Sequence, residues 1–346
     1  MARLSPSPVL RVGLVGFGLS GRYLQAPFYR AHPGFAVRRV VTSRAKELAE
    51  EFPHLKPTRG LEEVLADPSI DLVSIATPNA THYEMARAAL EADKHVLVDK
   101  PAAATAAELR ELRDLAARRG RHLFVFQNRR WDSDFLTLRR ILDGGELGTL
   151  VNYEARYDRW KPQPNAKPWK EVDGPAAGML YDLGAHIIDQ AIVLFGRPRE
   201  VSGKTWKQRE GSRIYDAFDL ALTYAEPLHV RLSCSLLVCE PTPRYTLHGR
   251  RGSYVKYGID VQEDQLRAGI QPGAADFGRE PTEQRGTLHR LDGEGALLRS
   301  QEPTRAGNWI KLFEAMHRTV TRGDPPAVHL EDVILQLEII EAAERI

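Results

Sequence analysis

Hydrophobic and polar residues follow one pattern in the first part of the chain and another in the second. Up to residue 126, short apolar runs rich in Val and Leu alternate with segments of helical period. This alternation predicts strands connected by helices, and therefore a parallel sheet. The predicted strands lie in "LRVGLVGFG" (10–18), "AVRRVVTSR" (36–44), "IDLVSIATPN" (70–79), "KHVLVDKP" (94–101) and "HLFVFQN" (122–128). The predicted helices include "ATHYEMARAALEAD" (80–93) and "TAAELRELRDLAARRG" (105–120).

From residue 127 the pattern changes, and strands dominate after Val201. Apolar and polar residues alternate there, which predicts an antiparallel or mixed sheet with one buried face. In this second part of the chain, the sequence predicts helices at 133–148 and 180–195 and two more after residue 308. It predicts strands at 150–160, 216–227, 228–240 and 243–258. Residues 269–301 are rich in Gly, Pro and charge, and we expect long loops there. The sequence thus predicts an α/β protein of two domains, residues 1–126 and 127–346.

Composition narrows the class of protein. A hydrophobic content of 42% and a charged content of 27% are typical of a globular protein with a packed core. The formal net charge of +2 argues against a nucleic-acid binder, which usually carries a basic patch. No apolar run approaches the ~20 residues of a membrane span, and the first residues lack the apolar core of a signal peptide. We therefore expect a cytoplasmic protein without nucleic-acid or membrane partners.

The two cysteines, Cys234 and Cys239, point to no special chemistry. They form no C-x-x-C motif, and no cluster of Cys and His has the spacing of zinc ligands. We expect neither a disulfide framework nor a metal site.

A glycine-rich turn, "GFGLSG", follows the first predicted strand and opens a predicted helix. In this context G-x-G-x-x-G binds the pyrophosphate of a dinucleotide at the helix N-terminus, where N–H groups are unpaired. Gly16 allows the tight turn, Gly18 lets the pyrophosphate approach the backbone, and Gly21 lets helix and strand pack closely. The alternative is a glycine-rich turn of an unrelated α/β protein. The predicted cofactor contacts of this turn are Gly16, Phe17, Gly18, Leu19, Ser20 and Gly21.

The residues after the second predicted strand indicate which dinucleotide is bound. An Asp or Glu about 20 residues after the fingerprint binds the ribose 2′-hydroxyl of NAD. Here Thr42, Ser43 and Arg44 occupy that place, and the first acid is Glu47. Arg and Ser bind a 2′-phosphate, which an acid would repel. We predict NADP as the cofactor, with Ser43 and Arg44 as contacts; the alternative is that Arg44 caps a loop and that NAD is also used.

The turn "ATPNATH" (76–82) ends another predicted strand, at the sheet edge where ligands bind in open α/β sheets. We predict that its polar residues line the cofactor. Thr81 is expected instead to cap the next helix. The predicted cofactor contacts here are Thr77, Pro78, Asn79 and His82.

The triplet Asp99-Lys100-Pro101 ends the next strand and is expected to face the same cleft. A partly desolvated lysine there can polarise a substrate oxygen. The alternative is a surface lysine paired with Asp99. We predict Asp99, Lys100 and Asn128 as further cofactor contacts, and Lys100 as a catalytic residue.

A polar stripe crosses the otherwise apolar helix "LYDLGAHIIDQAIVLF" (180–195). Asp182, His186 and Asp189 are four and three positions apart, which predicts that a helix presents them on one side. A histidine there can exchange a proton with a substrate hydroxyl, and Asp182 can orient the substrate or the imidazole. The alternative is a helix with one wet face. We predict catalytic roles for Asp182 and His186 and a supporting role for Asp189.

These motifs together resemble the glucose–fructose oxidoreductase / inositol 2-dehydrogenase family (Gfo/Idh/MocA). The resemblance is carried by "GFGLSG" (16–21), "TPNATH" (77–82), "DKP" (99–101) and "YDLGAHIIDQ" (181–190). The usual triplet of the family is Glu-Lys-Pro, so Asp99 keeps the carboxylate on a shorter side chain. The family's lysine falls on Lys100, and its motif D-x-G-x-H-x-x-D falls on Asp182, Gly184, His186 and Asp189.

Three further segments are similar to the NADP-dependent scyllo-inositol dehydrogenase branch of the family. They are "FQNRRWDSDFLTL" (126–138), "HGRRGSYVKYGID" (248–260) and "GNW" (307–309). The resemblance implies a Rossmann domain followed by an α/β domain with an open, mostly antiparallel sheet. It also implies a homodimer or higher homo-oligomer formed through the outer face of that sheet, which would otherwise expose an apolar patch.

The function that follows is an NADP-dependent dehydrogenase acting on a secondary alcohol of a cyclitol such as scyllo-inositol. Two alternatives stay open: a dehydrogenase of aldoses or other sugars, using NAD or NADP, and a dinucleotide-binding regulator without enzymatic activity. A regulator would not need Lys100, Asp182 and His186 together, which favours an enzyme. The predicted substrate contacts are Asn128, Arg129, Tyr157, Trp169, Asp182 and His186.

Overall fold

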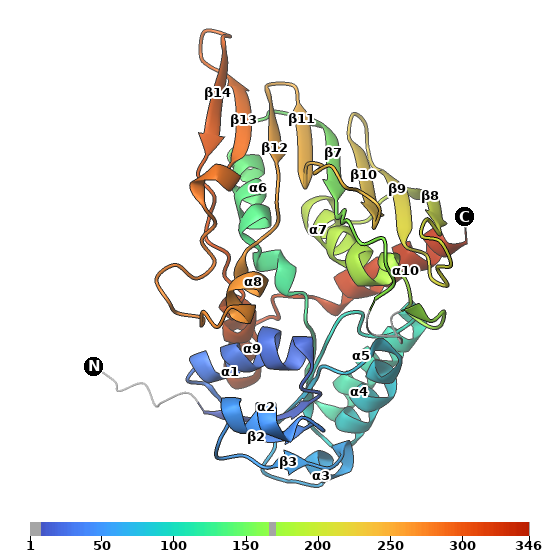
Figure 1. The fold of residues 1–346 in the computed structure, drawn as a ribbon, viewed down its shortest axis with the longest axis vertical. Helices are drawn as coiled ribbons and strands as arrows, with labels where there is room; N and C mark the ends of the chain where they lie inside the picture. Colours follow the sequence, from blue (N-terminus) through green and yellow to red (C-terminus); the bar gives the residue numbers. More distant parts are fainter. Residues whose placement is uncertain (1–7, 166–170, 346) are drawn as a thin grey trace. The chain divides into compact units, whose positions relative to one another are not determined.

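The computed structural model describes residues 8–165 and 171–345, which form two compact units (Figure 1). Unit 1 comprises residues 1–128, 263–277 and 309–331, and unit 2 comprises residues 129–262, 278–308 and 332–346. Unit 1 therefore combines the first part of the chain with two segments from its last third, residues 263–277 and 309–331. The two compact units are made of six segments, so the chain crosses between them in five places. The predicted single domain boundary between residues 126 and 127 therefore stays a prediction.

Unit 1 contains a parallel sheet of six strands in the order β3-β2-β1-β4-β5-β6. The strands are β1 (Leu10–Val15), β2 (Phe35–Val41), β3 (Pro57–Thr58), β4 (Leu72–Ile75), β5 (His95–Val98) and β6 (Leu123–Val125). The five apolar runs of the sequence form five of these strands, and every residue of β4 is buried. This is the Rossmann arrangement, with the switch between β1 and β4 as its characteristic ligand site.

The helices of unit 1 follow the predicted pattern. They are α1 (Ala26–Ala31), α2 (Ala45–Glu51), α3 (Leu61–Leu65), α4 (His82–Glu91), α5 (Ala106–Arg119) and α9 (Ile310–Arg322), with α8 (Gln262–Arg267) beginning at the last residue of a unit 2 segment. A capping box begins α5: Thr105 accepts a hydrogen bond from the Glu108 backbone, and the Glu108 side chain accepts one in return.

Aromatic side chains hold α9, the helix before the last, in unit 1. The Phe313 ring stacks on the Phe28 ring at 5.1 Å between centroids and meets Tyr29 edge-on at 5.0 Å. Trp309, just before α9, is fully buried and lies 6.2 Å from Phe28. Such aromatic contacts stabilise beyond the area that they bury, which explains why residues 309–331 belong to this unit.

Unit 2 contains an open sheet of eight strands in the order β14-β13-β12-β11-β7-β10-β9-β8. The strands are β7 (Leu150–Arg156), β8 (Glu200–Trp206), β9 (Ala217–Thr223), β10 (His229–Ser235), β11 (Tyr245–Gly249), β12 (Gly252–Lys256), β13 (Gly286–Leu291) and β14 (Leu297–Glu302). β7 and β10 pair in parallel, and the other neighbours pair antiparallel. The predicted open, mostly antiparallel sheet is confirmed. The expectation of loops over residues 269–301 is wrong in part, since β13 and β14 form a hairpin there.

One face of this sheet is buried and the other is polar. Tyr153 of β7, Leu232 of β10 and Tyr245 of β11 are fully buried on the inner face. On the outer face, exposed Arg231 of β10 pairs with Asp219 of β9. The outer face carries charged side chains at this place, whereas the resemblance implied an apolar patch on that face.

Unit 2 also contains the helices α6 (Ser133–Asp143), α7 (Ala185–Phe195) and most of α10 (Leu330–Glu344). α7 packs on the inner face of the sheet, where Phe195 meets the Tyr153 ring edge-on at 5.2 Å. The predicted helix over residues 180–195 is thus present, but its first turn, Leu180–Gly184, is π-helical.

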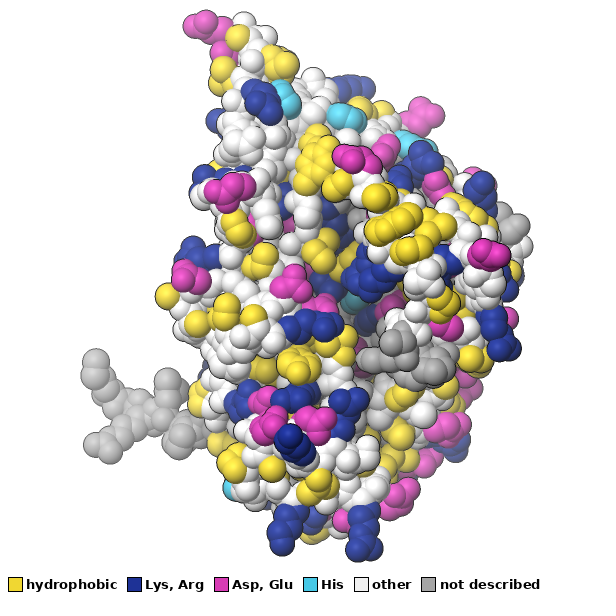
Figure 2. Space-filling view, viewed as in Figure 1, with side chains coloured by type: hydrophobic (Ala, Val, Ile, Leu, Met, Phe, Trp, Pro, Cys, Tyr) yellow, Lys and Arg dark blue, Asp and Glu magenta, His cyan; other side chains and the backbone are white. Residues whose placement is uncertain are grey.

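The surface is mixed in charge, as the composition predicts. In Figure 2, Lys and Arg side chains lie beside Asp and Glu side chains across the visible face. In unit 1, for example, Arg22 pairs with Glu50 and Glu51. Within the described ranges, no helix has both the length and the apolar character needed to cross a membrane.

Candidate functional site

The fingerprint turn in unit 1 has the geometry that a dinucleotide requires. It begins directly after β1. Gly16 has φ +94°, a backbone conformation that residues other than glycine rarely adopt. A Cβ on Gly21 would lie 2.0 Å from the Gly16 carbonyl oxygen, so this helix and turn pack as closely as predicted. A Cβ on Gly18 would meet no atom within 4 Å. The open space at Gly18 fits a pyrophosphate against the backbone.

The helix that follows the turn begins with a π-helical segment, Leu19–Gln25, before α1. A buried polar chain lies beneath it. Gln25 donates to Ser20 Oγ at 3.2 Å and accepts from Ser74 Oγ at 2.6 Å, and Tyr29 donates to Ser74 Oγ at 2.9 Å. Because Gln25 is fully buried, these bonds satisfy its amide and fix Ser20, one of the predicted cofactor contacts.

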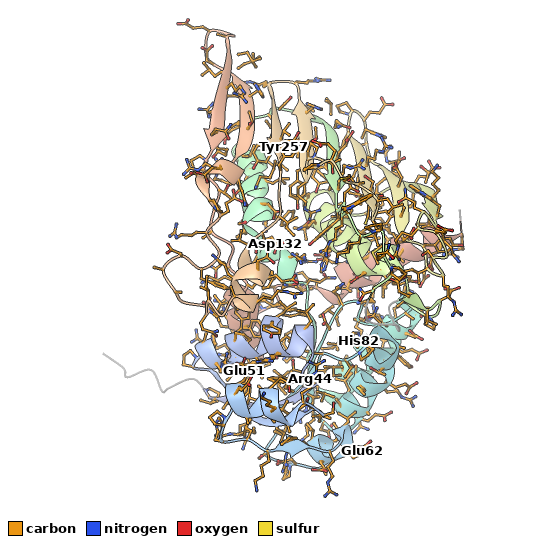
Figure 3. All side chains as sticks on the ribbon, viewed as in Figure 1. Arg44, Glu51, Glu62, His82, Asp132 and Tyr257 are labelled. Carbon is orange, nitrogen blue, oxygen red and sulfur yellow. The ribbon has the colours of Figure 1, made fainter. Side chains whose placement is uncertain are left out.

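His82 fixes the turn after β4 through hydrogen bonds of its imidazole. Figure 3 labels this histidine on α4. It is fully buried, and its Nδ1 lies 2.7 Å from the Pro101 carbonyl oxygen and its Nε2 lies 2.9 Å from the Thr77 carbonyl oxygen. His82 therefore joins the "TPN" turn to the "DKP" turn. It was predicted as a cofactor contact; its position gives it a part in shaping the two turns.

Thr81 does not cap α4, so that expectation is wrong. Its hydroxyl bonds to the Pro78 carbonyl at 2.8 Å and to Thr77 Oγ1 at 2.7 Å, and it makes no side-chain cap bond to the helix. Thr81 thus stabilises the turn that presents Thr77, Pro78 and Asn79.

Asp99 and Lys100 follow β5, at the same edge of the sheet as the fingerprint turn. The Asp99 carboxylate accepts a hydrogen bond from the Lys100 backbone N–H at 2.8 Å. Asp99 therefore shapes the backbone that carries Lys100. Lys100 is half-buried.

A cavity of about 480 Å³ opens beside the fingerprint turn. Gly16, Val41 at the end of β2 and Thr77 line it, together with residues of α3 and α4. Ser43 and Arg44 follow directly after β2; both are exposed, and the Thr42 hydroxyl accepts a hydrogen bond from the Arg44 backbone N–H at 2.9 Å. The Arg44 guanidinium pairs with Glu47 at 3.6 Å. The residues of unit 1 therefore offer a turn for the pyrophosphate and a cavity for an adenosine.

The polar helix of unit 2 begins with the π-helical turn that contains Asp182. π-Helical turns occur often at functional sites. Gly184, the glycine of the D-x-G-x-H pattern, faces Phe218 of β9, and a Cβ there would lie 3.1 Å from that ring. This close approach brings the start of the helix onto the sheet. Asp182 is half-buried and His186 is 6% exposed.

Tyr157, one residue after β7, lies beside His186 with 6.4 Å between ring centroids. Its ring is surrounded by guanidinium groups of Arg129, Arg159 and Arg244, at 5.5, 5.4 and 4.5 Å. The hydroxyl is buried and has no hydrogen-bond partner among the described residues. Burial raises the pKa of the phenol, and the three guanidinium groups act in the opposite direction. A neutral phenol without a partner can donate to a polyol.

Asp189 serves the structure of unit 2. It accepts hydrogen bonds from Arg130 Nε at 2.9 Å and Arg130 Nη2 at 2.7 Å, and Arg130 also pairs with Asp332 at 3.1 Å. Burial lowers the pKa of Arg130, but the two carboxylates outweigh it and the net pKa is raised. Asp189 thus anchors the helix that carries His186 to the segment that carries Arg129, in line with the supporting role predicted for it.

Gln190 is a second anchor, and no sequence pattern had singled it out. Its Nε2 donates to the Arg129 carbonyl at 3.0 Å, and its Oε1 accepts from Arg244 at 3.1 Å and from Tyr245 at 2.7 Å. Gln190 and Arg130 both lie inside quoted motifs, "YDLGAHIIDQ" and "FQNRRW", but their partners are distant in sequence. Only the polar character of these residues in apolar surroundings could have indicated them.

The remaining predicted substrate residues have different outcomes. Asn128 begins a short 3-10 helix (Asn128–Trp131) and is buried. Arg129, in the same helix, is buried and pairs with Asp132 at 3.1 Å. Trp169 lies outside the described residues. In the ranges that the structure describes, no group of three or more His, Cys, Asp or Glu side chains is arranged to hold a metal ion.

Comparisons with known proteins agree on both halves of the chain. "Oxidoreductase family, NAD-binding Rossmann fold" (GFO_IDH_MocA) matches residues 10–127, and "Oxidoreductase family, C-terminal alpha/beta domain" (GFO_IDH_MocA_C) matches residues 139–345. The scyllo-inositol 2-dehydrogenase (NADP(+)) IolW of Bacillus subtilis (strain 168) is 37% identical over 334 residues, 96% of this chain and 92% of that protein.

Two further proteins are similar over nearly the whole chain. The uncharacterized oxidoreductase YdgJ of Escherichia coli (strain K12) is 38% identical over 96% of this chain and 94% of that protein. A solved structure, that of the oxidoreductase yvaA from Bacillus subtilis in a triclinic form, has a TM-score of 0.91 at 36% identity and covers 97% of this chain and 96% of that one. The similarity therefore includes both the fingerprint turn and the polar helix.

Proposed function

Because the chain belongs to the Gfo/Idh/MocA family of oxidoreductases, we propose that it is an NADP-dependent dehydrogenase of a cyclitol such as scyllo-inositol. It would transfer hydride between the nicotinamide and a secondary alcohol of the substrate. The observation that carries this proposal is the similarity, over 96% of the chain, to a scyllo-inositol 2-dehydrogenase (NADP(+)). Two observations support it: the open space at Gly18 suits a pyrophosphate, and the Tyr157 hydroxyl, which has no hydrogen-bond partner among the described residues, suits a polyol.

The bound nicotinamide supplies the hydride chemistry itself. The residues of this chain would handle charge, orientation and the proton. Lys100 would stabilise the negative charge that develops on the substrate oxygen, and His186 would exchange the proton of that hydroxyl through its imidazole. Asp182 would accept a hydrogen bond from a neighbouring hydroxyl and so fix the substrate, while Tyr157 would donate one.

For the cofactor, we propose that Ser43 and Arg44 bind the 2′-phosphate of NADP. Both follow β2 and are exposed, and within the described ranges the only ion pair of the Arg44 side chain is the exposed one with Glu47. The measurement is the Kd of NADP and of NAD for the wild type and for Arg44→Ala. The proposal requires weaker NADP binding in the variant with unchanged NAD binding; an NAD preference in the wild type would contradict it.

Turnover of a substrate panel tests the function as a whole. The purified protein is incubated with NADP and with inositols or aldoses, and the absorbance of the reduced nicotinamide is followed. Turnover of scyllo-inositol above that of the aldoses supports the proposal, and the reverse order supports a sugar dehydrogenase. Tight NADP binding without turnover of any polyol would favour a regulator instead.

A homodimer or higher homo-oligomer, a cytoplasmic location and the absence of a nucleic-acid partner stay predictions. The outer face of the unit 2 sheet is polar, so an interface there would depend on ion pairs such as those available to Arg231 and Asp219. Light scattering at two salt concentrations measures the mass and shows whether such pairs contribute.

A further inference from the structure

The cavity beside the fingerprint turn has an acidic wall. Glu62 of α3 and Glu84 of α4 line it, and among the described residues neither Lys nor Arg does. A dinucleotide is a polyanion, and a site for one usually presents positive charge. The wall of this cavity therefore opposes part of the ligand that its turn is built to bind.

Glu62 lies on the side of the cavity nearest to the end of β2. β3 pairs with β2 through Thr58 and Val41, so the loop after β3 runs beside the loop that carries Ser43 and Arg44. A Cβ on Gly60 would lie 2.5 Å from Glu62 Oε2, which shows that the carboxylate folds back over its own loop. In the described part of the chain this carboxylate has no hydrogen-bond or ion-pair partner that would neutralise it.

Glu84 lies farther from that end of the cavity. It belongs to the helix after β4, and the strand order places β1 between β4 and β2. Arg44 is the cation on the β2 loop, but its side chain is 54% exposed and already faces Glu47. A second exposed arginine, Arg59, lies on the loop after β3, but neither Arg44 nor Arg59 lines the cavity as Glu62 does.

We infer that Glu62 weakens the binding of the 2′-phosphate and so limits the preference of this chain for NADP over NAD. This inference rests on the proposed use of NADP. The 2′-phosphate carries between one and two negative charges at neutral pH, and NAD lacks it. Glu62 repels the pyrophosphate of both dinucleotides, but the additional repulsion of the 2′-phosphate acts on NADP alone, so it changes the ratio of the two affinities. Because Glu62 is exposed, solvent and salt screen the repulsion, and its effect is about threefold in Kd.

The test compares the Kd of NADP and NAD, measured by calorimetry on the full chain, for the wild type and Glu62→Gln. The ratio Kd(NAD)/Kd(NADP) should rise about threefold in the variant. The rise should shrink at high salt, since screening weakens charge repulsion but leaves steric and hydrogen-bond effects in place. An unchanged or lower ratio, or a rise that persists at high salt, would overturn the inference.

Two matched variants make the result specific. Glu63→Gln removes the same charge from the same turn of α3 but does not line the cavity, so it should leave the ratio unchanged. Glu84→Gln should raise the ratio less than Glu62→Gln does. An equal rise in all three variants would indicate a general field effect and overturn the role of Glu62. Failure of the NADP proposal would appear separately, as an NAD preference of the wild type and no effect of Arg44→Ala.

Discussion

The predicted cofactor residues in unit 1 and the predicted substrate residues in unit 2 are held in place by different means. In unit 1, the turns are fixed by backbone atoms: Gly21 packs against the Gly16 carbonyl, and His82 bonds to two carbonyls. In unit 2, buried charged and polar side chains do the same work, above all Arg130 with Asp189 and Gln190 with its three partners. A turn that is fixed by its backbone atoms keeps its shape when most of its exposed side chains are replaced. A network of buried side chains loses hydrogen bonds when any one of its residues is replaced.

The largest expected effects come from one residue in each unit. Lys100→Met and His186→Ala should each lower kcat by about 10²–10⁴-fold, because each removes charge stabilisation or proton exchange from the reaction. The Kd of NADP should stay within about twofold, because neither variant alters the fingerprint turn. Steady-state kinetics and calorimetry measure both quantities. Near-full activity of either variant would show that the assigned role is wrong.

Asp189→Ala tests the side-chain network of unit 2. It leaves the Arg130 guanidinium buried with only Asp332 as a partner, and should lower the free energy of unfolding by about 3 kcal/mol. Asp332→Ala is the matched control, because its carboxylate is more exposed and should cost about 1 kcal/mol or less. Denaturant titration followed by fluorescence gives both values. Equal losses would mean that Arg130 does not depend on its buried partner.

Two glycine variants test the backbone-built turn of unit 1. Gly21→Ala places a methyl group 2.0 Å from the Gly16 carbonyl oxygen, and should destabilise the fold by about 1–3 kcal/mol. Gly18→Ala adds the same methyl group in open space, so thermal stability should not change while the Kd of NADP rises about tenfold. If Gly18→Ala binds NADP as the wild type does, the pyrophosphate does not lie over Gly18.

The smallest effect is expected for Tyr157→Phe. The buried hydroxyl has no partner among the described residues, so its removal should leave the stability of the ligand-free protein unchanged or slightly higher. The KM for the polyol should rise several-fold, since a hydrogen bond of about 1 kcal/mol is lost. Thermal denaturation and steady-state kinetics separate the two readouts. A clear loss of stability with unchanged KM would assign Tyr157 to packing.

The sequence predicted what depends on short-range patterns. The apolar runs of unit 1 became strands because both faces of a parallel sheet are buried, and the alternation in β9, β10 and β11 marked a sheet with one buried face. The hairpin of β13 and β14 was missed because β14 is exposed along almost its whole length, so its sequence carries no alternation to read. The π-helical turns were missed because no residue pattern distinguishes them from α-helical turns.

In the candidate site too, the sequence predicted the local features and missed the contacts between distant residues. Glycines of the fingerprint could be assigned individual roles because each role is local to the turn, and two of these roles are visible in the geometry of Gly16 and Gly21. The pairing of Arg130 with Asp189 spans 59 residues, and that of Arg244 with Gln190 spans 54. Such pairs are decided by the packed fold, so a single sequence shows the polar residues without showing which of them meet.

The stacking of Phe313 on Phe28 also bears on how the protein is made. The first 128 residues leave the ribosome with the whole parallel sheet, but without the aromatic side chains of residues 309–331 that cover Phe28 and Tyr29. During synthesis that surface stays uncovered until nearly the last helix has emerged. A fragment that ends at residue 128 would therefore carry every glycine of the fingerprint and still lack part of its own core.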